Sequence, residues 1–252
     1  MLAGKKILVA GAAGLLGERL VARLLSHGAE IIAVDLNLAA LQEKYKLSEL
    51  LSNPRLSVAE LDLNNALKVS DFFQFVEGID GAVNCAYPRN KQYGRSFYQV
   101  ELDDFNENVS LHLGSSFLFI QHCARYFQRN QTPFSLVNIS SIYGVVAPKF
   151  EIYNDTPMTM PVEYAAIKSA LIHLSKYVSS FVNDSRFRSN CVSPGGIIDR
   201  QPELFLQRYK DACLGKGMLD VEDVLGSIVF LLTDQSRYIN GQNLIVDDGF
   251  SL

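Results

Sequence analysis

Residues 5–35 read KKILVAGAAGLLGERLVARLLSHGAEIIAVD, and the architecture expected for the chain follows from them. A short apolar run gives way to glycines at positions 11, 14 and 17, and then to apolar residues at helical spacing. A second apolar run ends in Asp35. This order predicts a strand, a glycine turn, a helix and a second strand, as at the start of a parallel α/β sheet.

The glycine turn has the composition of a phosphate-binding turn. Glycines let backbone N–H groups approach a diphosphate at the positive end of a helix, where side chains would be in the way. A glycine-rich turn alone is weak evidence, because ordinary tight turns also use glycine. Here the strand before it and the helix after it supply the context of a dinucleotide site. The residues expected to form that site are Gly11, Gly14, Leu15, Leu16 and Gly17.

Asp35 bears on the choice of dinucleotide. A carboxylate at the end of the second strand accepts hydrogen bonds from the adenosine ribose hydroxyls and repels the additional phosphate of NADP. No Arg or Lys lies between Gly11 and Gly17 or directly after Asp35, so the usual partners of that phosphate are missing. Alternatively, Asp35 caps the helix that starts near Leu38. We predict NAD as the cofactor, with NADP less favoured.

Helical and extended patterns continue to alternate after residue 35, which argues for parallel strands joined by crossover helices. We predict a single-domain, Rossmann-type, doubly wound parallel sheet over residues 1–252, with helices on both faces. About seven strands are expected, at 5–10, 30–34, 56–61, 81–84, 134–139, 188–192 and 243–246. Helices are expected near 18–27, 39–51, 66–77, 100–130, 162–183, 202–213 and 221–233.

Ligands of such sheets bind outside the carboxyl ends of the strands. Glycine, proline and polar residues follow the predicted strands and should therefore line one edge of the sheet. They are Gly11, Asp35, Asp62, Asn84, Ser141 and Pro194.

Tyr164 and Lys168 lie four residues apart, on one face of the helix expected at 162–183. An ammonium near a phenol favours the phenolate and lowers the pKa of the phenol toward the working pH, where proton transfer is most efficient. Tyr and Lys at this spacing are also common on exposed helices. The spacing alone therefore does not indicate a catalytic pair, and the other motifs of the chain are needed to interpret it.

Composition bounds the class of protein. With 252 residues and 48% hydrophobic content, the chain can bury one sizeable core. Its 23 basic and 27 acidic residues form no basic block, so nucleic acid is not expected as a partner. The sequence has no signal-like start and no apolar run near the roughly 20 residues of a spanning helix, so a cytoplasmic protein without a membrane partner is expected. The four Cys and four His have no zinc spacing, which predicts free thiols and no metal.

In their order along the chain, the motifs resemble those of the short-chain dehydrogenase/reductase family over essentially the whole length. One such motif is weak, whereas the ordered set is specific. The set consists of the glycine turn, Asp62, Asn84-Cys85-Ala86, Asn138-Ile139-Ser140-Ser141, Tyr164 with Lys168, Asn190 to Gly195, and the ending Gly241-Gln242-Asn243 to Asp247-Asp248-Gly249.

The resemblance implies roles for these residues. Tyr164 would exchange a proton with the substrate oxygen while hydride moves between substrate and nicotinamide. Lys168 would hold the nicotinamide ribose, and Ser141 would hydrogen-bond the reacting oxygen, although Ser141 also suits a simple turn at a strand end. With Asp35 and the glycine turn, the cofactor-binding set implied is Asp62, Leu63, Asn84, Ala86, Tyr164, Lys168, Pro194, Gly195 and Ile197.

One position departs from the family. Its members usually carry an Asn on the long central helix, where it bends the helix and holds a water that links the Lys to solvent. In this chain His112 falls at that place, with Asn108 one turn earlier. Either His112 takes over the relay through its ring, or Asn108 does so after a shift, or His112 is only a packed residue.

The segment of about 143–162 is longer than in most members, and we expect it to cover the substrate together with a loop at about 195–218. Its aromatic and hydroxyl residues suit a polyhydroxylated ligand, and a phosphate would meet Arg89 or Lys149. The predicted substrate-binding residues are Tyr87, Arg89 and Tyr153.

The glycine spacing and Ser140 to Gly144 resemble the sugar-nucleotide-modifying branch, and the overall pattern resembles oxidoreductases of bacterial flagellin and surface-sugar modification. The expected function is NAD-dependent interconversion of an alcohol and a carbonyl on a sugar or nucleotide sugar, by a homodimer or homotetramer. The alternatives are reduction of a 3-oxoacyl thioester or other small carbonyl, and a catalytically silent NAD-binding regulator.

Overall fold

The computed structural model describes residues 1–252, and its sheet confirms the predicted fold class. All pairings are parallel, in the order β3-β2-β1-β4-β5-β6-β7. The order reverses between β1 and β4, which opens a crevice at the carboxyl ends of these strands. The strands are β1 (Lys6–Ala10), β2 (Glu30–Asp35), β3 (Leu56–Glu60), β4 (Gly81–Asn84), β5 (Phe134–Ile139), β6 (Phe187–Pro194) and β7 (Asn243–Val246).

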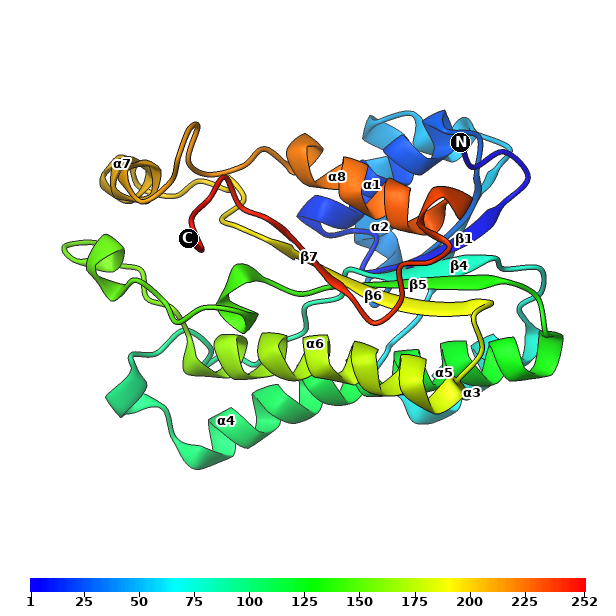
Figure 1. The fold of residues 1–252 in the computed structure, drawn as a ribbon, viewed down its shortest axis with the longest axis horizontal. Helices are drawn as coiled ribbons and strands as arrows, with labels where there is room; N and C mark the ends of the chain where they lie inside the picture. Colours follow the sequence, from blue (N-terminus) through cyan, green and yellow to red (C-terminus); the bar gives the residue numbers. More distant parts are fainter.

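Helices cover both faces of the sheet (Figure 1). One face carries α1 (Leu15–Ser26), α2 (Leu38–Leu47) and α8 (Val221–Leu232), and the other carries α3 (Ala66–Phe75), α5 (Ser115–Asn130) and α6 (Val162–Val182). The ribbon places α4 (Leu102–Asn108) and α7 (Glu203–Asp211) toward the end of the molecule where the strands end. None of the helices is both long enough and apolar enough to cross a membrane.

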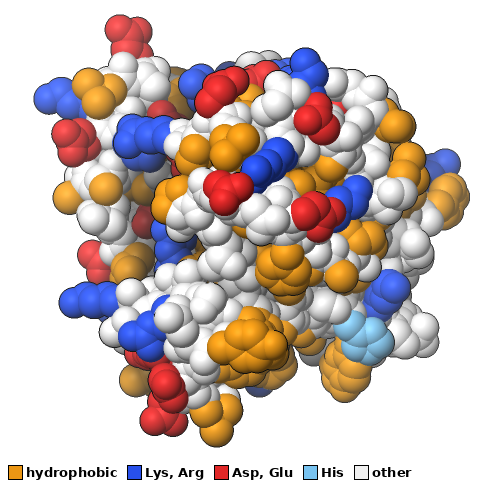
Figure 2. Space-filling model, turned by 90° about the vertical axis from the view of Figure 1, so that its left-hand side faces the viewer, with side chains coloured by type: hydrophobic (Ala, Val, Ile, Leu, Met, Phe, Trp, Pro, Cys, Tyr) orange, Lys and Arg blue, Asp and Glu red, His pale blue; other side chains and the backbone are white.

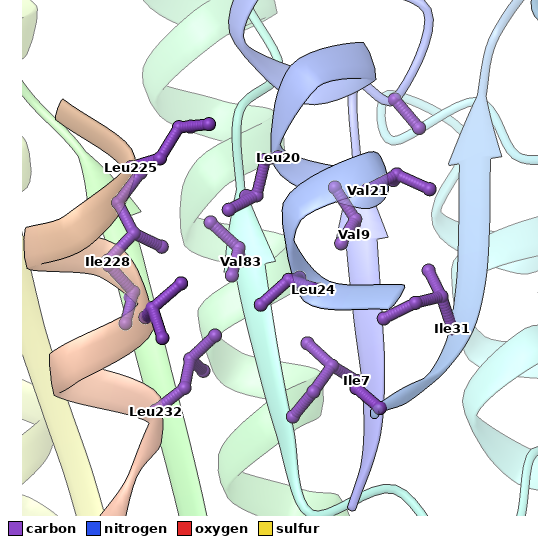
Figure 3. Packing of buried hydrophobic residues seen from close by; sticks show 14 of the residues in the cluster. Ile7, Val9, Leu20, Val21, Leu24, Ile31, Val83, Leu225, Ile228 and Leu232 are labelled. Carbon is purple, nitrogen blue, oxygen red and sulfur yellow. The ribbon is translucent and has the colours of Figure 1, made fainter. Parts of the chain in front are cut away.

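The core fixes α1 over the first strands. Successive side chains of a strand point to opposite faces, so Ile7 and Val9 pack under α1 and α8 while their neighbours face α5 and α6. In Figure 3, α1 and α8 lie side by side on this face, and Leu24 and Leu232 belong to the same buried cluster. Because α1 packs against both the sheet and α8, its first turn has a fixed position beside the carboxyl end of β1.

The long helix predicted at 100–130 is helical from Leu102 to Asn130, but it is not an α-helix throughout. It consists of α4, a π-helical turn at Val109–Gly114, and α5. A π-helical turn adds one residue to the hydrogen-bond ladder, and such turns often occur at functional sites. Apolar periodicity does not reveal this change of ladder, so the sequence predicted an unbroken helix.

The four cysteines are free thiols, as predicted. Cys123 and Cys191 are buried, whereas Cys85 and Cys213 are only partly buried.

The two segments predicted to cover the site pack against one another. A separate apolar cluster contains Tyr153, from the 143–162 segment, and Phe205, from α7, with their rings 5.1 Å apart. Arg208 of α7 also forms an ion pair with Asp155 at 3.2 Å. The segment and α7 therefore form one wall at the carboxyl edge of the sheet.

Candidate active site

A cavity of about 970 Å³ lies along the carboxyl ends of the strands. Figure 2 faces this end of the molecule, where acidic and basic side chains alternate without an extended basic patch. The structure brings all of the predicted site residues to this cavity except Asn84 and His112. Those in its lining are Gly11, Gly14, Leu15, Leu16, Gly17, Asp35, Asp62, Leu63, Ala86, Tyr87, Arg89, Ser141, Tyr153, Tyr164, Lys168, Pro194, Gly195 and Ile197.

The glycine turn has no room for side chains. Gly11 has φ +74°, and a Cβ there would lie 2.7 Å from the backbone nitrogen of Ala86. A Cβ at Gly17 would overlap the Gly11 carbonyl oxygen. Helix α1 begins with Gly14 as N-cap and has no side-chain cap, so its first N–H groups remain available beside the cavity. The turn thus fits the diphosphate of a dinucleotide.

Asp35 does not cap α2. Asn37 is the N-cap and accepts a hydrogen bond from the Ala40 N–H at 3.0 Å. The Asp35 carboxylate instead accepts from the N–H groups of Ala13 (2.9 Å) and Asn37 (3.1 Å), one at each oxygen. Each oxygen keeps a free lone pair, so the carboxylate can still accept from two ribose hydroxyls.

Asn84 lies behind the cavity wall and not in it. Its side chain is buried, donates to Ser116 Oγ at 3.2 Å and accepts from the Ala86 N–H at 3.2 Å. Asn84 therefore shapes the chain after β4, while Ala86 lines the cavity. The sequence could not separate these roles, because β4 ends at Asn84 and the direction of the chain beyond it depends on the hydrogen bond from the Ala86 N–H to the Asn84 side chain.

Tyr164, Lys168 and Ser141 meet in the cavity. The Lys168 Nζ lies 5.5 Å from the centre of the Tyr164 ring and donates to the Ile139 carbonyl at 2.7 Å. Ser141 is buried, and its Oγ accepts from the Tyr143 N–H at 3.2 Å. The turn proposed as the alternative role of Ser141 is therefore present, and its hydroxyl hydrogen can point to the Tyr164 oxygen or to a ligand.

The pKa of Tyr164 is raised, contrary to the expectation that Lys168 would lower it. Burial of the phenol is the main cause, and it outweighs the nearby Ser141 hydroxyl, which lowers the pKa. Burial also lowers the pKa of Lys168, to about 8, so the ammonium itself is destabilised. Without a ligand, the phenol is therefore held protonated and ready to donate.

The buried Lys168 predicts a pH-dependent stability. Its pKa falls from an ordinary 10.5 to about 8 on folding, so the unfolded chain binds more protons between these pH values. The free energy of unfolding should therefore rise with pH across this window, by up to about 3 kcal/mol. Denaturant unfolding measures the free energy of unfolding of the wild type and of Lys168→Met. The value for the wild type minus the value for the variant should rise as the pH increases through this window. A difference that stays constant would contradict the burial of a charged ammonium.

His112 lies in the π-helical turn, outside the cavity lining. Its ring is 5.1 Å from that of Tyr87, and both ring nitrogens are buried without a hydrogen-bond partner. Burial, and then the charge of Lys168, lowers the pKa of His112 to about 2. The ring is thus neutral, with one donor and one acceptor nitrogen.

Asn108 is engaged elsewhere. Its Nδ2 donates to Asn90 Oδ1 (3.1 Å) and to the Asp104 carbonyl (3.0 Å), and its Oδ1 accepts from the Asn90 N–H (2.9 Å). Asn108 therefore anchors the loop after β4. The His112 ring lies beside the Tyr87 ring, which Lys168 Nζ also approaches to 5.6 Å, whereas the Asn108 amide is also within 3.4 Å of Glu163 Oε1.

Two residues near the site had no sequence signal. Glu163, directly before Tyr164, is buried, and its Oε2 has no partner. An acidic residue in the first turn of a helix is normally an exposed one that faces the helix dipole. Lys44 donates to the Ala13 carbonyl at 2.7 Å, behind the glycine turn. It comes from α2 and is distant in sequence from the turn, so the composition of the turn does not reveal it.

A family model described as enoyl-(acyl carrier protein) reductase matches residues 11–251. The fold matches that of a short-chain dehydrogenase from Leptospira borgpetersenii solved with bound NAD+, with a TM-score of 0.86 and 29% identity over 100% of this chain and 94% of that one. The chain belongs to the short-chain dehydrogenase/reductase family. It is therefore an oxidoreductase.

Relatives within the family differ in what they are known to act on. The chain is 37% identical, over the full length of both proteins, to post-translational flagellin modification protein A of Campylobacter coli. It is 26% identical to the 7alpha-hydroxysteroid dehydrogenase of Bacteroides fragilis, over 98% of this chain and 95% of that one. The first of these confirms the resemblance to flagellin-modifying members of the family.

Proposed function

We propose that this protein uses NAD to interconvert an alcohol and a carbonyl on a sugar or nucleotide sugar. The observation that carries the proposal is that Tyr164 and Lys168 open into the same cavity as the glycine turn. A dinucleotide lying on the turn can thus extend to the phenol. The likeness to a flagellin modification protein, and the hydroxyl and aromatic groups of Tyr87 and Tyr153 in the cavity, support a sugar as substrate.

Each part of the cavity has a role in this proposal. The glycine-turn N–H groups bind the diphosphate, and Asp35 accepts from the adenosine ribose. Lys168 donates to the second ribose, and Ser141 donates to the reacting oxygen. Tyr164 gives its proton to that oxygen during carbonyl reduction and takes it back during alcohol oxidation. A bound nicotinamide would supply or accept the hydride.

His112 returns the proton to Lys168 and Tyr164 in this proposal. A neutral imidazole can accept a proton at one nitrogen and release one from the other. We expect His112→Asn, which keeps a donor and an acceptor, to retain most of the turnover, and His112→Ala to lose it. Steady-state rates of the two variants make the comparison. Equal losses in both would remove the relay role and leave His112 as a packed residue.

A second candidate function is reduction of an apolar carbonyl such as a 3-oxoacyl thioester. The substrate end of the cavity is also lined by Met158, Met160, Phe205 and Met218, which would suit an apolar chain. The third possibility, a silent NAD-binding regulator, is disfavoured because Ser141, Tyr164 and Lys168 converge on one cavity.

Homo-oligomerisation remains part of the proposal. Phe117 of α5 and Tyr177 and Phe181 of α6 are exposed on the outer helical layer, and the last two rings stack at 6.2 Å. Exposed aromatic rings on neighbouring helices support association through this layer.

An NAD-coupled screen tests the proposed function. Sugars, sugar phosphates and nucleotide sugars are compared with 3-oxoacyl thioesters and steroid ketones, and the absorbance of NADH is followed. Turnover of a sugar compound is the expected result. Turnover of thioesters alone would support the second candidate, and NADH binding without any turnover would support a regulator.

A further inference from the structure

Arg89 lies at the substrate end of the cavity, in the loop that follows β4. Its guanidinium carbon is 4.9 Å from the centre of the Tyr87 ring and 6.0 Å from that of Tyr93. The Tyr87 ring meets the Tyr164 ring edge to face at 5.5 Å. One aromatic ring therefore separates the guanidinium from the phenol proposed to react.

The platform under Arg89 is well defined. The hydroxyls of Tyr87 and Tyr93 are hydrogen-bonded at 2.5 Å, and their rings pack edge to face at 5.8 Å. Stacking on an aromatic ring holds the plane of a guanidinium and leaves its N–H groups free at the edges. An anion that binds there meets a partly ordered fork of donors, so less side-chain freedom is lost on binding.

Arg89 has no anionic partner within the protein. It takes part in none of the ten ion pairs of the chain. The other basic residue of the lining, Lys168, donates to the Ile139 carbonyl. Lys149, which the sequence offered as an alternative phosphate ligand, is outside the lining and donates to the Phe250 carbonyl at 2.8 Å. Arg89 is thus the basic side chain of the lining that is left to bind a ligand.

We infer that the substrate carries a negatively charged group, a carboxylate or a phosphate, and that Arg89 binds this group beside Tyr164. The inference rests on the proposed function, because it names the class of sugar that the same cavity takes. A fork of N–H donors pairs with either anion through two parallel hydrogen bonds, and it gives no comparable advantage to a neutral sugar.

The surroundings of Arg89 leave space for such a group. Arg89 also lines a second cavity of about 470 Å³, with Asn90, Lys91 and Gln92 among its other walls. Two carboxylates line that cavity as well, but Asp104 is paired with Arg95 at 2.9 Å and Glu107 accepts from Asn90 at 2.7 Å. An anion at Arg89 therefore lies where the two cavities adjoin, with room on its far side for solvent or for the nucleoside of a nucleotide sugar.

Calorimetric titration of the protein tests this inference, with and without NAD. The probes are glucose, glucuronate, glucose 6-phosphate and UDP-glucose. At least one anionic probe should bind about 10-fold or more tighter than glucose, and its affinity should fall as salt is added. Which anionic probe binds best distinguishes a carboxylate, a terminal phosphate and a diphosphate as the group that Arg89 recognises.

Variants assign the effect to Arg89. Arg89→Met should abolish the tighter binding of the anionic probe and leave the weak glucose affinity unchanged. Arg89→Lys should keep part of the tighter binding, because the positive charge remains although the fork of N–H donors is lost. Arg125→Met, at an exposed cation on α5, is the control for loss of charge and should bind like the wild type. If Arg89→Met does not fold, the affinities of the probes for the wild type and for Arg89→Lys still show whether Arg89 binds the anionic group.

Two outcomes would overturn the inference: glucose binding as tightly as every anionic probe, or Arg89→Met binding the anion as the wild type does. Its failure is distinct from failure of the proposed function. A protein that binds NADH and turns over neutral sugars but gains nothing from an anion contradicts the inference alone. One that binds the anions through Arg89 but does not bind NADH contradicts the proposed function alone.

Discussion

Replacing Tyr164 with Phe is expected to lower turnover by about 10²- to 10⁴-fold, the range of a general acid/base group. The substitution removes one hydroxyl from a ring that burial already keeps protonated and leaves the packing against Tyr87 in place. Cofactor affinity should stay within about twofold, because the glycine turn, Asp35 and Lys168 supply the main contacts to the diphosphate and the riboses in this proposal. Steady-state kinetics and a fluorescence titration with NADH measure the two quantities.

The matched control is Tyr177→Phe, which removes an exposed hydroxyl from the same helix. It should leave both turnover and NADH affinity unchanged. Turnover by Tyr164→Phe at the wild-type rate would mean that the reacting oxygen obtains its proton from another group, and the roles given to Lys168 and His112 would fall with it.

NADPH is expected to bind about 100-fold more weakly than NADH, because its additional phosphate would face the carboxylate of Asp35 and like charges in contact cost several kcal/mol. Asp35 is held in place by the Ala13 and Asn37 N–H groups, so it cannot easily turn away. Lys44 is not placed to bind this phosphate, since its ammonium donates to the Ala13 carbonyl, pairs with Glu18 at 3.6 Å and lies outside the lining.

Asp35→Asn should narrow this preference by weakening NADH binding and strengthening NADPH binding, because the amide keeps an acceptor but loses the charge. Glu60→Gln, at an exposed carboxylate at the end of β3, is the control and should keep the wild-type ratio. Equal affinity of the wild type for the two cofactors would refute the assignment of NAD from Asp35.

The sheet could be predicted from the sequence because each strand is a short apolar run that ends in a turn or polar residue. Strands β4, β5 and β7 have the predicted bounds, and the others differ only at their ends. The glycine turn could also be predicted, because backbone that packs too closely for a Cβ at Gly11 and Gly17 requires glycine there, and glycine is visible in the sequence. The π-helical turn around His112 was not predictable, because it changes the hydrogen-bond ladder and leaves the apolar periodicity almost intact.

Side-chain environments in the candidate site were harder to predict than its location. The spacing of Tyr164 and Lys168 indicated a lowered phenol pKa, but burial dominates both groups and depends on the whole fold. Arg89 and Lys149 were equivalent in sequence, and the fold separates them by tying Lys149 to the C-terminal segment. Glu163 became visible only as a buried carboxylate oxygen without a partner.

A crystal structure of the protein with NADH bound is the most direct test of the proposed site. The diphosphate is expected on the N–H groups of the glycine turn, and the nicotinamide ring in contact with Tyr164 and Lys168, with its reactive carbon facing the space beside Arg89. A nicotinamide ring lying away from Tyr164, or a dinucleotide bound elsewhere on the protein, would contradict the assignment of this cavity as the active site.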